Sequence, residues 1–186
     1  MDKTVAAKVW KKDELKYIKS FIEKSNKINQ HAKYPPRMRR TLFLLKGNTL
    51  KHKQYRSIIK FILSYGFRIT QLFWTVLGNK EKFFKKFYSH VSPQIIEREA
   101  NVNFSNICLA IITNDNRIRE HQVVVKRLIR YQHGTESIHA SDNWVKANQE
   151  IAMVKDTTKM NWNGISDAFV ARWKYKEHQR KKTRGN

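Results

Sequence analysis

Hydrophobic positions recur along most of this chain at the spacing of an amphipathic α-helix. In residues 117–134, RIREHQVVVKRLIRYQHG, the apolar Val124, Leu128 and Ile129 fall on one helical arc, and basic side chains fall on another. The basic arc contains Arg119, Lys126, Arg127 and Arg130. Asn116 is a favourable N-cap residue and Gly134 a common helix stop. The pattern predicts a helix over 117–133 with one buried face and one basic face.

Similar spacing predicts helices in most other parts of the chain. They are expected at 13–28, 37–46, 51–65, 68–77, 80–88, 103–113, 143–154 and 161–181. Gly, Asn, Ser or Pro positions separate these segments, and strand-like alternation hardly appears. Since β-branched residues look too few and too scattered for a sheet, the expected fold class is all-α, with two small helical-bundle lobes and a basic surface.

The lobe boundary is expected in the least regular segment, residues 89–103. This divides the chain into an N-terminal helical lobe at 1–95 and a C-terminal helical lobe at 96–173. Residues 174–186, KYKEHQRKKTRGN, are strongly basic and offer little to bury, so they are expected to form a frayed basic tail.

Net charge is the feature of the composition that bears most directly on function. The chain has 38 Lys and Arg against 15 Asp and Glu, a formal net charge of +23 at pH 7, spread along its whole length. Such an excess repels itself in a folded monomer and is usually relieved by a polyanion, most often nucleic acid. We therefore expect a nucleic-acid partner.

Other features favour a soluble cytoplasmic protein with no membrane partner. The first residues lack the apolar core of a signal peptide, and no uncharged run approaches the roughly 18 residues of a membrane span. The single cysteine, Cys108, lies in the apolar run NICLAII, so it is expected to be a core residue in a reducing compartment.

Catalytic motifs are scarce. The seven histidines form no HExxH or zinc-ligand pattern, and no glycine-rich phosphate loop is present. These absences predict no metal, no cofactor and no enzyme. One alternative stays open, because Arg127–His133 and Arg172–His178 share a spacing that resembles the motif of HEPN-type ribonucleases, in which such a histidine would act as general acid–base.

Binding of phosphates without base readout needs cations spaced along a rigid surface. Helical arcs supply that spacing in several segments, including RMRR (37–40) and KHKQYR (51–56). The candidate nucleic-acid-binding residues are Arg37, Arg39, Arg40, Lys51, Lys53, Arg56, Arg117, Arg119, Lys126, Arg127 and Arg130. The aromatic side chains among the lysines of 80–88 are assigned to the core instead.

Six short blocks follow one another over about residues 37–173: RMRRTLFLLK, LKHKQYRSIIKF, TQLFWTVLG, NFSNICLAI, RIREHQVVVKRLIR and NWNGISDAFVARW. Their order resembles that of the small subunit of the type I-E CRISPR Cascade complex, the CasB family. The resemblance implies a two-lobed all-helical protein without catalysis, present as a pair among other Cascade subunits. It would hold target DNA and the guide-RNA backbone through Arg39, Arg40, Arg56, Arg117 and Arg130.

Residues and resemblance lead to the same expectation, a non-catalytic nucleic-acid-binding subunit of a guide-RNA surveillance complex. The alternative is a free-standing DNA- or RNA-binding protein from a plasmid or phage, since basic helical chains are common there. A Cascade subunit should need its partners to bind strongly, whereas a free-standing protein should not.

Overall fold

The strands of this chain form a single antiparallel β-sheet. The computed structural model describes residues 12–46, 48–51, 54–77, 79–89, 92–94, 96–97, 107–114, 120–134 and 137–159. The strands are β1 (Arg40–Leu45), β2 (Arg68–Val76), β3 (Ile107–Asn114), β4 (Ile138–Ala140) and β5 (Thr158–Lys159). They form a five-stranded sheet in the order β4-β1-β3-β2-β5. The fold class is therefore α/β, and the predicted all-α class is wrong.

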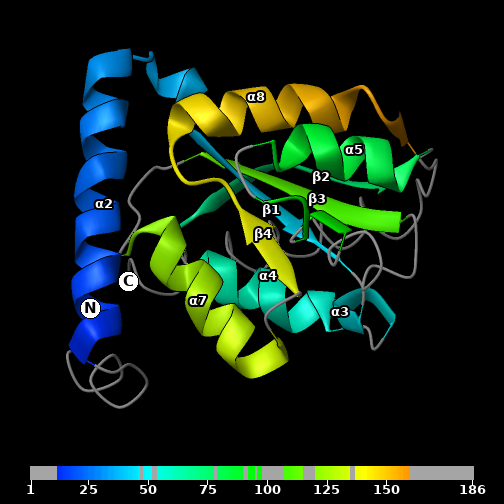
Figure 1. Cartoon of the computed structure of the whole chain (residues 1–186), viewed down its shortest axis with the longest axis horizontal. Helices are drawn as coiled ribbons and strands as arrows, with labels where there is room; N and C mark the ends of the chain where they lie inside the picture. The colour runs from blue at the N-terminus through cyan, green and yellow to red at the C-terminus, as the bar shows by residue number, and fades with distance from the viewer. Residues whose placement is uncertain are drawn as a thin grey trace, which may run out of the picture.

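Helices cover both faces of this sheet (Figure 1). They are α2 (Lys12–Ala32), the 3-10 turn η1 (Pro36–Met38), α3 (Asn48–Lys51), α4 (Tyr55–Ser64), α5 (Lys80–Phe87), α7 (Gln122–His133) and α8 (Trp144–Lys155). The predicted helices at 13–28, 51–65, 80–88, 117–133 and 143–154 are confirmed by α2, α4, α5, α7 and α8, with somewhat different ends. The predicted helix at 161–181 and the basic tail lie outside the described residues.

Three predicted helices are strands instead. The segments 37–46 and 68–77 contain β1 and β2, and β3 overlaps the segment 103–113. Residues 41–45 of β1 are all buried, because the strand lies inside the sheet and has helices on both faces. A short, continuous apolar run of this kind has the same hydrophobic pattern in a buried strand and in a buried helix. Periodicity alone therefore did not distinguish the two.

The core has two layers, one on each face of the sheet. Leu42 and Leu44 of β1 pack in one layer, with side chains of α5 and α8. Phe43 and Leu45 point to the opposite layer, with side chains of α4 and α7. This alternation is the period-two geometry of a strand. Cys108 is buried in the first layer, which confirms its predicted core position, and burial raises the pKa of its thiol to about 12.

Strands from both predicted lobes share the sheet, since β3 pairs with β1 and with β2. The described residues therefore do not form two separate helical bundles. The N-terminal helix α2 stands beside the sheet, against α7 and α8 (Figure 1). Among the residues described, each helix is too short or too polar to span a bilayer. The cytoplasmic location stays a prediction.

Candidate functional site

The predicted phosphate-binding cations of α7 engage the protein itself. Lys126 Nζ lies 3.3 Å from both the Ala140 carbonyl oxygen and Asp142 Oδ1, and the Arg130 Nε donates to the Ile138 carbonyl at 2.9 Å. Burial lowers the pKa of Lys126, although the nearby Asp142 opposes that shift. The Arg127 guanidinium lies 5.3 Å from the centre of the Tyr17 ring. The structure thus directs these three cations toward β4, the loop after it and α2.

The arginines before and within β1 are arranged differently. Arg37 is exposed, whereas Arg39 lies over the Trp144 ring, 5.5 Å from its centre. Arg40 is partly buried and hydrogen-bonds the side chain of Asn148 on α8 through two of its nitrogens. Arg39 and Arg40 therefore both contact α8.

Of the remaining predicted cations, Arg56 lies on another helix, and the others have side chains outside the described residues. Arg56, on α4, is exposed with its guanidinium 6.0 Å from the centre of the Tyr55 ring. The side chain of Lys51 and all of Lys53, Arg117 and Arg119 lie outside the described residues. The same holds for Arg172 and His178, so the second half of the ribonuclease-like pattern is not described.

A buried polar cluster lies beneath α5 and α8, where no function was predicted. His139 of β4 is 7% exposed, and its Nε2 lies 2.9 Å from Oε2 of Glu150 on α8, whose side chain is fully buried. The Ser141 hydroxyl donates to the same carboxylate oxygen at 2.5 Å. The other oxygen, Glu150 Oε1, is buried and has no hydrogen-bond partner. A buried carboxylate with an unused oxygen is unusual in a purely structural network.

Burial keeps the His139 ring neutral, and the Glu150 carboxylate fixes which of its two nitrogens carries the proton. Burial lowers the pKa of His139, with Glu150 opposing and the lysines Lys126 and Lys46 reinforcing the shift. The ring is therefore neutral near pH 7, with its single proton on Nε2, directed at the carboxylate. Nδ1 then carries a lone pair, and no described residue hydrogen-bonds it. The geometry presents Nδ1 as a nucleophile.

Lys46 brings a positive charge to this cluster. It directly follows β1, is fully buried, and donates from Nζ to the Tyr88 hydroxyl at 3.2 Å. Its ammonium also lies 5.5 Å from the centre of the Tyr88 ring, and that ring lies 5.6 Å from the ring of His139. A buried ammonium near a neutral, oriented imidazole is an arrangement suited to an anionic group such as a phosphate. In the described ranges, no three His, Cys, Asp or Glu side chains gather as a metal site would require.

A partly buried histidine joins α2 to the rest of the fold. His121, the N-cap of α7, accepts from the Val123 amide through Nδ1, so its Nε2 donates to the Ser25 hydroxyl at 3.2 Å. Ser25 in turn donates to the Asp142 carbonyl oxygen at 2.5 Å. Burial first, and then Lys126, lower the pKa of His121 to about 4, although Asp142 opposes the shift. This contact requires a neutral ring.

Acid should therefore weaken the fold through His121. Between about pH 6.5 and pH 4 the unfolded chain binds a proton at this residue that the folded chain does not, so stability falls as pH falls. The expected loss between pH 7 and pH 4.5 is about 2–3 kcal/mol, measured by urea denaturation. His121→Gln should flatten the slope, and His31→Gln, an exposed histidine of α2, should not. An unchanged slope in His121→Gln would contradict this assignment.

Sequence reasoning overlooked His139, Glu150 and Lys46, although each left a signal. Glu150 shares its helical face with Ala147, Ile151 and Val154, which places a carboxylate on an apolar face. His139 lies in the buried strand Ile138–Ala140, and Lys46 ends an apolar run. A charged or titratable residue inside an apolar pattern is the signal that could have identified the cluster.

Comparison with known proteins supports the fold. No protein-family model and no curated protein sequence matches this chain. Among solved structures, the nucleoside diphosphate kinase of Encephalitozoon cuniculi is similar, with a TM-score of 0.52 and 18% identity over 71% of this chain and 99% of that chain. The nucleoside diphosphate kinase of Aquifex aeolicus has a TM-score of 0.47 and 17% identity, over 62% of this chain and 93% of that one. A nucleoside diphosphate kinase family protein of Babesia bovis has a TM-score of 0.47 and 13% identity, over 66% of this chain and 93% of that chain.

At these identities the likeness concerns the fold alone. The chain is similar in fold to the Encephalitozoon enzyme, and it contains almost the whole of that fold together with additional residues. A fold by itself does not establish an activity, so the function has to be argued from the buried cluster.

Proposed function

We propose that this chain is a phosphotransferase that moves a phosphoryl group between nucleotides through His139. The observation that carries the proposal is the hydrogen bond of Nε2 to Glu150, which leaves Nδ1 unprotonated. The proposal also draws on the similarity in fold to a nucleoside diphosphate kinase. It replaces the sequence-based expectation of a non-catalytic protein.

The proposed reaction has two displacements at phosphorus. The Nδ1 lone pair attacks the terminal phosphorus of a nucleoside triphosphate, and the bond from that phosphorus to the bridging oxygen breaks with its electrons, releasing the diphosphate. A terminal oxygen of a second diphosphate then attacks the phosphohistidine. The N–P bond breaks, its electrons return to Nδ1, and a new triphosphate leaves.

Three side chains support these steps. Glu150 stabilises the partial positive charge that develops on the imidazole as Nδ1 forms its bond, and Ser141 fixes that carboxylate in place. The Lys46 ammonium offsets negative charge that accumulates on the phosphoryl oxygens. The low exposure of His139 keeps water, the competing acceptor, away from the phosphohistidine.

The direct test is to trap the phosphorylated protein. The unmodified chain is incubated with ATP that is radiolabelled at its γ-phosphate, and the label should appear on the protein as an acid-labile, alkali-stable phosphoramidate. Mass spectrometry should place it on His139, and added GDP should remove it as labelled GTP. Label at another residue, label lost only as inorganic phosphate, or a folded protein without label would each refute the proposal.

The expected role in a guide-RNA complex stays a prediction. It rests on a resemblance that implies an all-helical body, which is not the fold of this chain. The net charge of +23 favours a polyanionic partner independently of that resemblance.

A further inference from the structure

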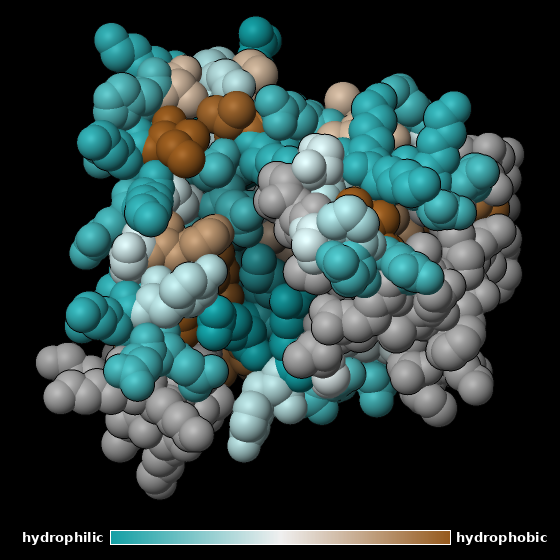
Figure 2. Space-filling model, viewed as in Figure 1, coloured by the Kyte–Doolittle hydropathy of each residue, from teal (hydrophilic) through white to brown (hydrophobic). Residues whose placement is uncertain are grey.

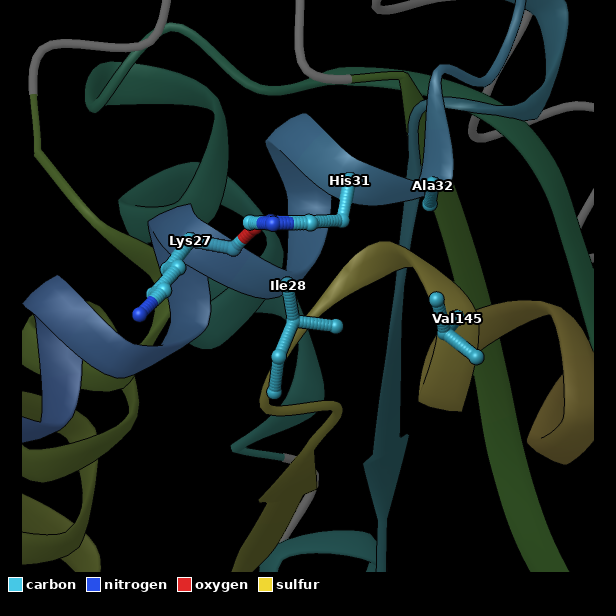
Figure 3. Close-up of a pocket in the computed structure, with 5 residues that line it drawn as sticks. All are labelled: Lys27, Ile28, His31, Ala32 and Val145. Carbon is cyan, nitrogen blue, oxygen red and sulfur yellow. The ribbon is translucent and has the colours of Figure 1, made fainter.

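An apolar pocket lies between α2 and the beginning of α8, outside the His139 cluster. Its volume is about 450 Å3, and it is lined by Lys27, Ile28, His31, Ala32 and Val145. Figure 3 shows Ile28 and Val145 on its two sides, one from each helix. Ile28 is 43% exposed, which is high for a large aliphatic side chain. In Figure 2 an apolar area lies in this region and is bordered by hydrophilic side chains.

Lys27 lines this pocket, and further basic side chains follow it along the chain. Lys27, Lys33 and Arg37 are exposed, and within the described residues none of the three makes an ion pair. Arg39 continues the basic surface: its Nε donates to the Tyr34 carbonyl oxygen at 2.9 Å, and its guanidinium lies over Trp144. Trp144 adjoins the lining residue Val145, and its amide is bonded to Asn29, which adjoins the lining residue Ile28, so Arg39 lies close to the pocket. We call the pocket together with Lys27, Lys33, Arg37 and Arg39 the α2–α8 surface.

The α2–α8 surface is held in shape by bonds between distant segments. The Trp144 amide donates to Asn29 Oδ1 at 2.7 Å, which joins the start of α8 to α2. Asn148 Nδ2 donates to the Met38 carbonyl at 2.9 Å, which joins α8 to η1. The cations therefore stand on a fixed framework, as recognition of a repeating phosphate backbone requires.

We propose that the α2–α8 surface binds a single-stranded polynucleotide, with a base in the pocket and neighbouring phosphates on Lys27, Lys33 and Arg37. The charge favours a polyanion, because the chain carries +23. The apolar pocket favours a single strand over a duplex, whose bases are already stacked within the helix. This inference does not depend on phosphoryl transfer at His139.

The test compares two triple variants of equal charge. Fluorescence anisotropy measures binding of a labelled 20-mer of thymidylate at several salt concentrations. Lys27→Glu/Lys33→Glu/Arg37→Glu removes cations of the α2–α8 surface, and Lys60→Glu/Lys82→Glu/Lys86→Glu removes exposed cations of α4 and α5. The first variant should bind about 30-fold more weakly, with the slope of log affinity against log salt reduced by about 2, at ~0.7 per phosphate contact. The second should lose less than about threefold.

A neutral substitution tests the pocket separately. Ile28→Ser should weaken binding about fivefold without changing the salt slope, since it removes contact with a base and no charge. Equal losses in the two triple variants would overturn the proposal, because binding would then follow overall charge. Tighter binding of a duplex of the same length, or binding of phosphatidylserine vesicles without binding of the 20-mer, would overturn it as well.

Discussion

Replacing His139 with glutamine is expected to lower phosphoryl transfer from ATP to GDP at least about a thousandfold, because the side chain that accepts the phosphoryl group is lost. The glutamine amide can still donate to Glu150, so the buried carboxylate keeps a partner. The free energy of unfolding should therefore fall by less than about 2 kcal/mol. Transfer is measured with labelled ATP, and stability by urea denaturation.

The control for this variant is His31→Gln. His31 is exposed on α2, where its Nδ1 lies 2.7 Å from the Lys27 carbonyl oxygen, and it has no contact with the cluster. Its transfer rate should match that of the unmodified chain. If His139→Gln retained the rate and the phosphoprotein, another residue would be the phosphoryl acceptor. Loss of activity together with loss of folding would be resolved by the trapping experiment on the unmodified chain.

Replacing Glu150 with alanine should lower the free energy of unfolding by about 3–5 kcal/mol, more than the His139→Gln or Gln149→Ala substitution. The Glu150 side chain is fully buried and accepts from Ser141 and His139. Its negative charge also interacts favourably with the partly buried Lys126. Removal leaves donors without an acceptor, buried positive charge without its counter-charge, and a cavity beneath α8.

Two further variants show whether that loss comes from the buried carboxylate. Gln149→Ala changes the exposed neighbour on α8 and should stay within about 0.5 kcal/mol of the unmodified chain. Glu150→Gln keeps an acceptor oxygen for Ser141 and His139, so its free energy of unfolding should lie between those of Glu150→Ala and Gln149→Ala. Urea denaturation at pH 7 measures all three. A Glu150→Ala variant as stable as Gln149→Ala would mean that the cluster does not contribute to the stability of the fold.

Local sequence determined most helices and the charge of this protein. The helices α4, α5, α7 and α8 follow from apolar positions at helical spacing, and Asn143 and Gly134 bound α8 and α7 as their residue types suggest. Asn143 caps α8 by accepting from the Lys146 amide at 2.9 Å. These features depend on residues a few positions apart, so the local sequence is enough to predict them.

Only the tertiary structure decided the sheet and the candidate site. The strand β1 pairs with β3, about 70 positions away, and such pairing leaves no local signal in a run such as TLFLL. Lys46 and Tyr88 are 42 positions apart, and His139 meets Glu150 because β4 leads through a short loop into α8, which covers the same face of the sheet. Arg130 of α7 likewise donates to the Ile138 carbonyl oxygen, because β4 lies beside that helix. Long-range pairing sets which side chains meet, and composition and periodicity do not carry that information.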